Sequence, residues 1–284
     1  MAINRPNVFS GGAATNTDLY LDAAAGKLGE AARVISFSGR NPDVDSFPEY
    51  LTFNGLQRSP TSSTYYDGIS SSSTSDAAAG IGAQKVFIEG IDDDGDLASE
   101  VVTLDGTSLV SFTNDYYVIN RCAVIEAGSV GSNLGNLQLR EGMAGRGSGE
   151  VLSGGISQLN QAGYPRGFFP ILQNVRVRVG QEAGTSVAGD MQVFLYHAQN
   201  MEGDVVLSRI RTYDVPFNSL EAGTYELSEE FIVPPHVLTG QIQGTDFTNV
   251  PTSGYFYFTA DGDVAGMNIV VSASADLLYR DVRA

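Results

Sequence analysis

The apolar residues of this chain recur in short runs with a period of two, and turn residues separate the runs. The clearest series covers residues 84–140. Asp105-Gly106 stands between two of its runs, and Asp-Gly at such a place indicates a hairpin because glycine adopts a positive φ at no steric cost. Short runs at this spacing predict an antiparallel sheet. Strands are expected at residues 86–91, 101–104, 109–112, 117–125 and 137–139.

A second series of runs follows residue 164. Val175, Val177 and Val179 alternate with Arg176 and Arg178, which predicts a strand with one buried and one charged face. About eight strands in this half are typical of a β-sandwich, with Pro234-Pro235 at an edge or corner because proline cannot donate to a ladder. The runs lie at residues 168–172, 175–179, 191–197, 205–210, 213–217, 225–233, 237–242, 255–258 and 269–273.

The pattern predicts an all-β protein with two antiparallel β-sandwich domains, jelly-roll-like or immunoglobulin-like. Glycines gather in residues 141–163, which places the domain boundary there. The Ser-rich segment 59–83 is interpreted as a surface loop or weak edge strand, or alternatively as a strand packed through Ser70–Ser73. The expected division is an arm over 1–33 with a short helix near 17–25, a domain over 34–145, a linker over 146–163 and a domain over 164–284.

Charge narrows the range of partners. The 284 residues include 33 acidic and 16 basic ones, for a net charge of −17. Such a surface repels phosphate backbones and anionic headgroups, so neither nucleic acid nor a membrane is an expected partner. No apolar run approaches the roughly 20 residues of a membrane helix, and residues 1–12 lack the apolar core of a secretory signal. The single cysteine, Cys122, is expected to be a buried thiol, which suggests assembly in a reducing cytosol.

One acidic segment begins like a calcium-binding loop. Asp92, Asp94, Asp96 and Glu100 occupy its first, third, fifth and ninth positions. Leu97 then stands where the motif requires glycine, and Thr103 where it requires glutamate. A solvated hairpin turn is therefore the preferred interpretation, and cation binding stays the alternative.

The remaining chemical candidates are weak. Arg176 with Arg178, and Arg209 with Arg211, form either solvated faces or docking points for an acidic neighbour. His197 and His236 lie far apart in sequence and accompany no nucleophile motif, and Gly145-Arg146-Gly147 lacks the Lys-Ser/Thr of a phosphate loop. The run Tyr255–Phe258 forms either a sugar platform or, more simply, a buried strand. No catalytic, cofactor-binding or metal-binding residue is predicted, and no cofactor.

Several segments resemble a virion structural protein of tailed bacteriophages. The resemblance covers roughly residues 34–140, with a weaker similarity after Tyr164. The segments that carry it are Ser38–Asp45, Asp76 with Gly80-Ile81-Gly82-Ala83, Val86–Asp92, Ser99–Thr107, Ile119–Val124 and Ala127-Gly128-Ser129. The resemblance implies a place on a virus particle and transfers no catalytic residue.

The first functional hypothesis is a non-enzymatic structural protein of a bacteriophage virion, a capsid decoration, cement or head-associated protein. Its partners would be other virion proteins, the major capsid or head–tail proteins, and further copies of itself, with a trimer favoured. It would be located in the virion, after assembly in the host cytoplasm. The alternative is a tail fibre or host-recognition module that binds glycans, and an enzyme such as a depolymerase comes third.

Overall fold

The protein is built from β-strands. The computed structural model describes residues 32–44, 48–52, 65–141, 147–181, 189–201, 204–217, 225–229, 253–263 and 269–281. These residues form antiparallel sheets and no helix, which confirms the predicted all-β class. Within them no helix is long and apolar enough to cross a membrane. The helix predicted near residues 17–25 and the strand predicted at 237–242 lie outside the described residues.

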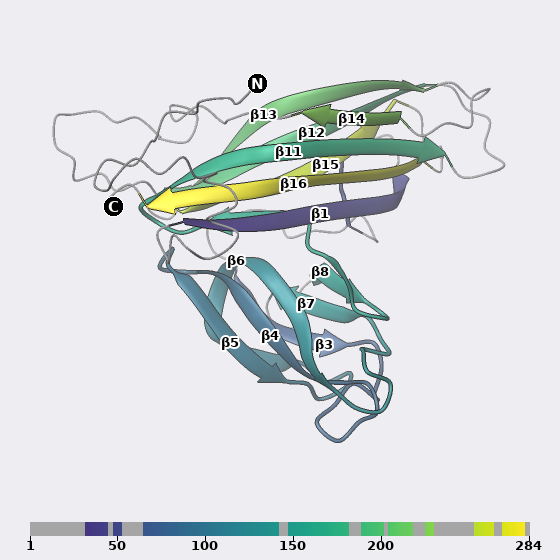
Figure 1. Ribbon diagram of the computed structural model, residues 1–284, viewed down its shortest axis with the longest axis vertical. Coiled ribbons are helices and arrows are strands. Elements are labelled where there is room, and N and C mark those ends of the chain that lie inside the picture. Colours follow the sequence, from purple (N-terminus) through teal and green to yellow (C-terminus); the bar gives the residue numbers. More distant parts are fainter. Residues whose placement is uncertain are drawn as a thin grey trace, which may run out of the picture.

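Two sheets pack face to face as a sandwich (Figure 1). The first has four strands, in the order β1 (Ala32–Val44), β16 (Ile269–Asp281), β11 (Phe168–Gln181) and β14 (Tyr225–Glu229). The second has five strands: β10 (Gln161–Tyr164), β15 (Gly254–Gly262), β12 (Gly189–Met201) and β13 (Asp204–Phe217) in order, with β2 (Glu49–Tyr50) also paired to β15.

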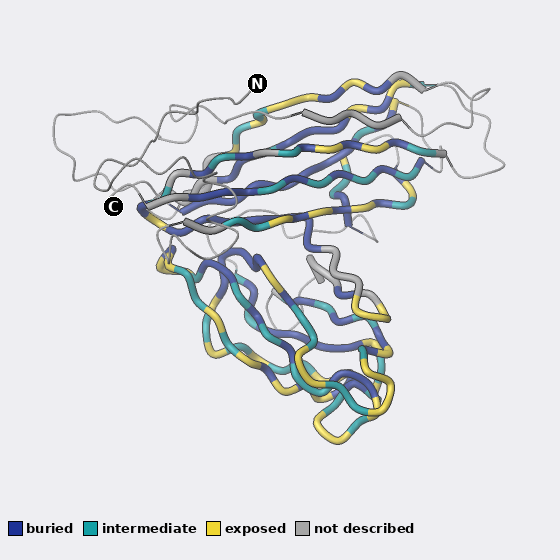
Figure 2. Tube along the Cα trace, in the orientation of Figure 1, coloured by how far each residue is buried: buried dark blue, intermediate teal, exposed yellow. Residues whose placement is uncertain are grey.

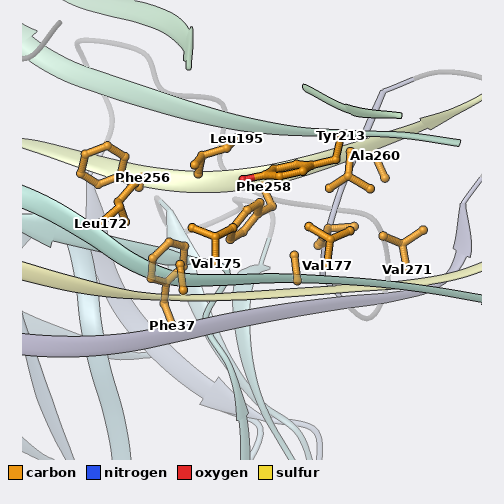
Figure 3. Close-up of a cluster of buried hydrophobic side chains, with 14 of the residues drawn as sticks. Phe37, Leu172, Val175, Val177, Leu195, Tyr213, Phe256, Phe258, Ala260 and Val271 are labelled. Atoms are coloured by element: carbon orange, nitrogen blue, oxygen red, sulfur yellow. The ribbon is translucent and has the colours of Figure 1, made fainter. Parts of the chain in front are cut away.

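The core of the sandwich follows from period-two alternation. In β11, Val175, Val177 and Val179 are buried while Arg176 and Arg178 are exposed, as the sequence pattern predicts. The same alternation appears as dark blue and lighter segments along the strands of the four-stranded sheet (Figure 2). Aromatic rings fill the space between the sheets, and the Phe37 and Phe258 rings stack with centroids 5.5 Å apart (Figure 3).

A third sheet of seven strands projects from the sandwich (Figure 1). It curls over its own core, because Val102 near one edge packs in the same apolar cluster as Leu137 and Val151 near the other. The order is β5 (Leu97–Thr103), β4 (Ala83–Asp92), β6 (Val110–Ala127), β3 (Tyr66–Ser71), β7 (Leu137–Glu141), β8 (Gly147–Leu152) and β9 (Ile156–Gln158).

The strand pairing corrects the expected grouping of segments. Residues 34–44 were expected with the first sheet, but β1 pairs with β16 in the sandwich, at the far end of the sequence. Residues 147–158, expected in a linker, form β8 and β9. The seven-stranded sheet is thus inserted between β2 and β10. The strand β3 is buried between β6 and β7, so the Ser-rich segment is not an edge strand there. Separate strands were expected at 109–112 and 117–125, but one strand, β6, covers both.

Strand β10 joins the inserted sheet to the sandwich. Its backbone pairs with β15 on one side. On the other side, the Asn120 side chain of β6 replaces a neighbouring strand: its Nδ2 donates to the Gly163 carbonyl at 3.0 Å, and its Oδ1 accepts from the Gly163 N–H at 2.6 Å. Only glycine fits at position 163, where the inserted sheet and the sandwich meet. A Cβ added there would lie 2.2 Å from Val118 Cγ1. The two parts therefore meet through a close-packed seam in which the N–H and the carbonyl of Gly163 are both hydrogen-bonded.

Candidate interaction surface

The acidic segment forms a tight turn between β4 and β5. The Asp96 N–H donates to Asp92 Oδ1 at 2.8 Å, and Gly95 has the positive φ of 81° that the turn requires. Arg166, in the turn between β10 and β11, donates its N–H to the Gly95 carbonyl at 2.7 Å, and its guanidinium lies 3.4 Å from the Asp96 carboxylate. Burial and the neighbouring carboxylates raise the pKa of Asp92, although the bond from Asp96 opposes the shift. The described residues contain no group of three or more possible metal ligands.

Two titratable side chains considered in the sequence, Cys122 and His197, are buried. Burial raises the pKa of the Cys122 thiol to about 12, so the thiol stays protonated. His197 is buried, its ring stacks on that of Phe256 with centroids 4.6 Å apart, and its Nε2 lies 2.8 Å from the Tyr164 hydroxyl. The whole run from Tyr255 to Phe258 is buried as well, which favours the buried strand over a sugar platform. His236 lies outside the described residues.

His197 gives the first testable prediction. Burial lowers its pKa to about 3, whereas a histidine in the unfolded chain titrates near 6.5. The unfolded chain therefore binds the proton first, and stability falls as the pH drops from 6.5 towards 3. Between pH 7 and pH 4 this group should cost about 3 kcal/mol of unfolding free energy.

The measurement is urea denaturation at both pH values. His197→Gln carries no titrating ring, so its loss of stability between pH 7 and pH 4 should be smaller than that of the unmodified chain by about 3 kcal/mol. His236→Gln removes the other histidine of the chain, so comparing the two variants separates the contributions of the two rings. Equal losses in the unmodified chain and in His197→Gln would contradict the assignment.

Two loops are joined by hydrogen bonds at the distal end of the seven-stranded sheet, at the bottom of Figure 1. The loops 72–82 and 128–136 meet there, and we call them together the distal tip. The Gly128 N–H donates to the Gly82 carbonyl at 2.8 Å, and the Val130 N–H donates to the Ile81 carbonyl at 3.0 Å. These contacts bring together two of the segments that carry the sequence resemblance, Gly80-Ile81-Gly82-Ala83 and Ala127-Gly128-Ser129.

A buried carboxylate fixes the distal tip. Asp76 is fully buried and accepts four hydrogen bonds. The donors are the Ser71 hydroxyl at 2.6 Å, and the backbone N–H groups of Ala83 at 2.8 Å, Leu134 at 2.9 Å and Gly135 at 2.8 Å. Burial alone would raise the pKa of this carboxyl, but the four hydrogen bonds together hold it below its usual range. One charged side chain thus ties both loops to the ends of β3 and β4.

Glycines let the loops of the distal tip approach closely. An added Cβ would lie 2.1 Å from Asp76 Oδ1 at Gly82, and 2.4 Å from the Gly80 carbonyl oxygen at Gly128. Beneath the loops, Gly106 donates its N–H to the Asp76 carbonyl at 2.7 Å and has a positive φ of 60°. Asp105-Gly106 thus forms a turn, but the hairpin predicted there is wrong, because β5 pairs with β4 and β6 pairs with β4 and β3.

The distal tip presents apolar side chains to solvent. Ile81, Val130 and Leu134 are 53%, 45% and 37% exposed. Exposed aliphatic side chains on backbone fixed by buried hydrogen bonds form a preorganised contact surface. Sequence reasoning did not single out these three residues as a site, although Asp76 and Gly80–Ala83 belong to the resemblance.

The arginine pairs lie on two different sheets. Arg176 and Arg178 project from the outer face of the four-stranded sheet, and Arg209 and Arg211 are exposed on β13. The Arg209 guanidinium lies over the Phe194 ring, 5.0 Å from its centroid. The structure therefore offers two kinds of contact surface, an apolar one at the distal tip and a basic one on the sandwich.

Comparison with known proteins does not identify a family for this chain. No protein-family model matches the chain, and no curated protein matches it. Among solved structures, it is similar to a chain in the structure of infectious bursal disease virus Gx strain, with 11% identity over 88% of this chain and 71% of that chain, at a TM-score of 0.27. It is also similar to the infectious bursal disease virus VP2 subviral particle, with 13% identity over 88% and 72% and a TM-score of 0.19. At TM-scores this low the similarity carries no argument about this chain.

Proposed function

We propose that this chain is a non-enzymatic structural protein of a bacteriophage particle that acts as a capsid decoration or head-associated protein. The observation that carries the proposal is the distal tip, a preorganised apolar surface at the end of a sheet that projects from a sandwich. The sequence resemblance supports the same role, since two of its segments meet at this surface.

The mechanism is burial of matched surfaces. The sandwich supplies a rigid base, and the seam at β10 holds the projecting sheet against it. When the exposed parts of Ile81, Val130 and Leu134 contact a neighbouring subunit, each buried aliphatic side chain stabilises the contact by about 1 kcal/mol or more. Little affinity is lost to ordering the loops, because Asp76 already orders them. Many copies on a lattice would then strengthen the shell against internal pressure.

The direct test locates the protein on particles of the virus that encodes it. A decoration protein should occur in copies spread over the shell lattice in electron cryomicroscopy, and particles without it should lose heat or osmotic tolerance. A few copies at the tail, with loss of adsorption after deletion, would support the alternative host-recognition module instead. A monomeric chain that hydrolyses a polysaccharide would contradict both roles.

Substitutions at the distal tip test the surface itself. The triple variant Ile81→Ser, Val130→Ser, Leu134→Ser should bind particles that lack the protein at least tenfold more weakly than the unmodified chain, because it removes most of the apolar contact area. Since the side chains are exposed, its unfolding free energy should change by less than about 1 kcal/mol.

The matched control is Val101→Ser, Ile125→Ser. Both residues are 54% exposed and lie on β5 and β6, outside the loops of the distal tip. Binding of this variant should equal that of the unmodified chain. If the two sets of substitutions weaken particle binding equally, the distal tip is not the contact surface.

A further inference from the structure

The outer face of the four-stranded sheet carries three arginines around a row of serines. Arg40 projects from β1, and Arg176 and Arg178 project from β11. Between these strands runs β16, where Ser272 is paired with Arg40 and Arg178, and Ser274 is paired with Arg176. We call this set the Arg–Ser face. It lies on the sheet turned towards the viewer in Figure 1.

The spacing of the strands gives the Arg–Ser face its dimensions. Adjacent strands lie about 4.8 Å apart, so the backbones of β1 and β11 are about 10 Å apart across β16. Arg176 and Arg178 are separated by about 7 Å along their strand. Serine side chains are short, so the longer arginine side chains stand above them on both sides. A carboxylate placed over the serines could accept paired hydrogen bonds from a guanidinium.

Two arginines of the Arg–Ser face, Arg40 and Arg176, are not paired with the carboxylates of this sheet. Asp276 accepts a hydrogen bond from Ser36 Oγ at 2.5 Å and another from Asn174 Nδ2 at 2.9 Å. Arg178 already has an interaction partner, so it is not one of these two. Arg40 and Arg176 make no hydrogen bond or ion pair with any residue that the structure describes. In a chain with 33 acidic and 16 basic residues, two exposed arginines of this kind indicate a partner that carries carboxylates.

The same chain presents such carboxylates at the turn between β4 and β5. Asp93 and Asp94 are exposed at its tip, and within the described residues their side chains have no hydrogen-bond or ion-pair partner. The backbone beneath them is fixed, because the Asp92 N–H donates to the Asp96 carbonyl at 2.9 Å and the Asp93 N–H donates to the Asp115 carbonyl at 3.0 Å. The two carboxylates therefore occupy a rigid corner of the molecule.

We propose that the Arg–Ser face of one copy binds the Asp93–Asp94 corner of a second copy. This inference rests on the proposed function, since it names a contact through which subunits assemble. Two different surfaces meet in such a contact, so copies associate head to tail and close into a ring when the rotation between them permits. Exposed ion pairs are individually weak, so they orient the copies while the surrounding buried area supplies affinity.

Charge reversal tests the contact in solution. Sedimentation velocity should show that the unmodified chain associates at 50 mM salt, and that association is at least tenfold weaker at 500 mM salt. Arg40→Glu, Arg176→Glu should be monomeric at both salt concentrations, and so should Asp93→Arg, Asp94→Arg. An equimolar mixture of these two variants should associate again, because the reversed face of one complements the reversed corner of the other.

The control is Arg121→Glu, Arg209→Glu, which reverses two exposed arginines elsewhere and should associate as the unmodified chain does. Full association of either test variant alone, or failure of their mixture to associate, would overturn the inference. A chain that is monomeric in every form but still decorates particles would overturn the head-to-tail contact and leave the proposed function intact.

Discussion

Asp76→Ala should destabilise the protein by about 3–5 kcal/mol, the largest effect expected of any single substitution in the seven-stranded sheet. The change removes an acceptor of four hydrogen bonds and leaves the buried N–H groups of Ala83 and Gly135 and the partly buried N–H of Leu134 without partners. Unsatisfied buried donors cost about 1–3 kcal/mol each, and entry of water into the loosened loops reduces the sum. Urea denaturation at pH 7 measures the loss.

Two further variants show whether the carboxylate itself is required. Asp76→Asn should cost almost as much as Asp76→Ala, because each carboxylate oxygen accepts at least one backbone N–H and an amide group would turn a donor towards one of them. Ser71→Ala removes two hydrogen bonds, the one that the Ser71 hydroxyl donates to Asp76 and the one that it accepts from the Ser73 N–H, and should cost about 1–3 kcal/mol. In Asp76→Ala, hydrogen exchange should accelerate most in loops 72–82 and 128–136. Exchange that accelerates evenly over the whole chain would contradict a local role.

Gly163→Ala should destabilise the protein by about 2–4 kcal/mol, because the new methyl group has no space at the seam. It would lie 2.2 Å from Val118 Cγ1 and 3.1 Å from Ile91 Cγ1. The backbone cannot move away without breaking the two hydrogen bonds between Gly163 and Asn120. The free energy of unfolding from urea denaturation reports the cost.

A double-mutant cycle separates this clash from other effects of alanine. Val118→Ala removes the Cγ1 atom that the new methyl group would meet, so Gly163→Ala should cost at least about 1 kcal/mol less in that background. The φ of Gly163 is not positive, so alanine there has no backbone strain to obscure the result. An identical cost in both backgrounds would show that the seam adapts and that Gly163 is not required for close packing.

The strands themselves were largely predictable from sequence. Alternating valines and arginines in β11 fixed which face is buried, and Asp105-Gly106 marked a turn that the structure contains. Which strands pair with one another could not be predicted. Period-two alternation shows which face of a strand is buried, but it does not show which strand lies beside it. The pairing of β1 with β16 joins residues more than 200 positions apart, as in Phe37 with Ala275, and no local signal records it.

The distal tip escaped prediction for a different physical reason. The sequence around an aspartate in a segment rich in serine and glycine is the same in two cases: the charge is stabilised by solvent, or it is stabilised by four hydrogen bonds in the folded protein. Gly80 and Gly82 were placed in a surface loop or weak strand, whereas Gly82 and Gly128 are required because other loops pass within van der Waals distance. Only the resemblance had marked these residues, and it did so without a chemical role.

The insertion of the seven-stranded sheet has a consequence for biosynthesis. A ribosome completes residues 65–158 long before it reaches β16, so the inserted sheet can fold while the sandwich still lacks a strand at the centre of one layer. Until residue 281 has left the exit tunnel, β11 has one open edge and β1 has no neighbour in its sheet. Of the strands that the structure describes, the one that joins β1 to β11 is synthesised after all the others, so truncation before β16 should be more damaging than loss of an equally long surface loop.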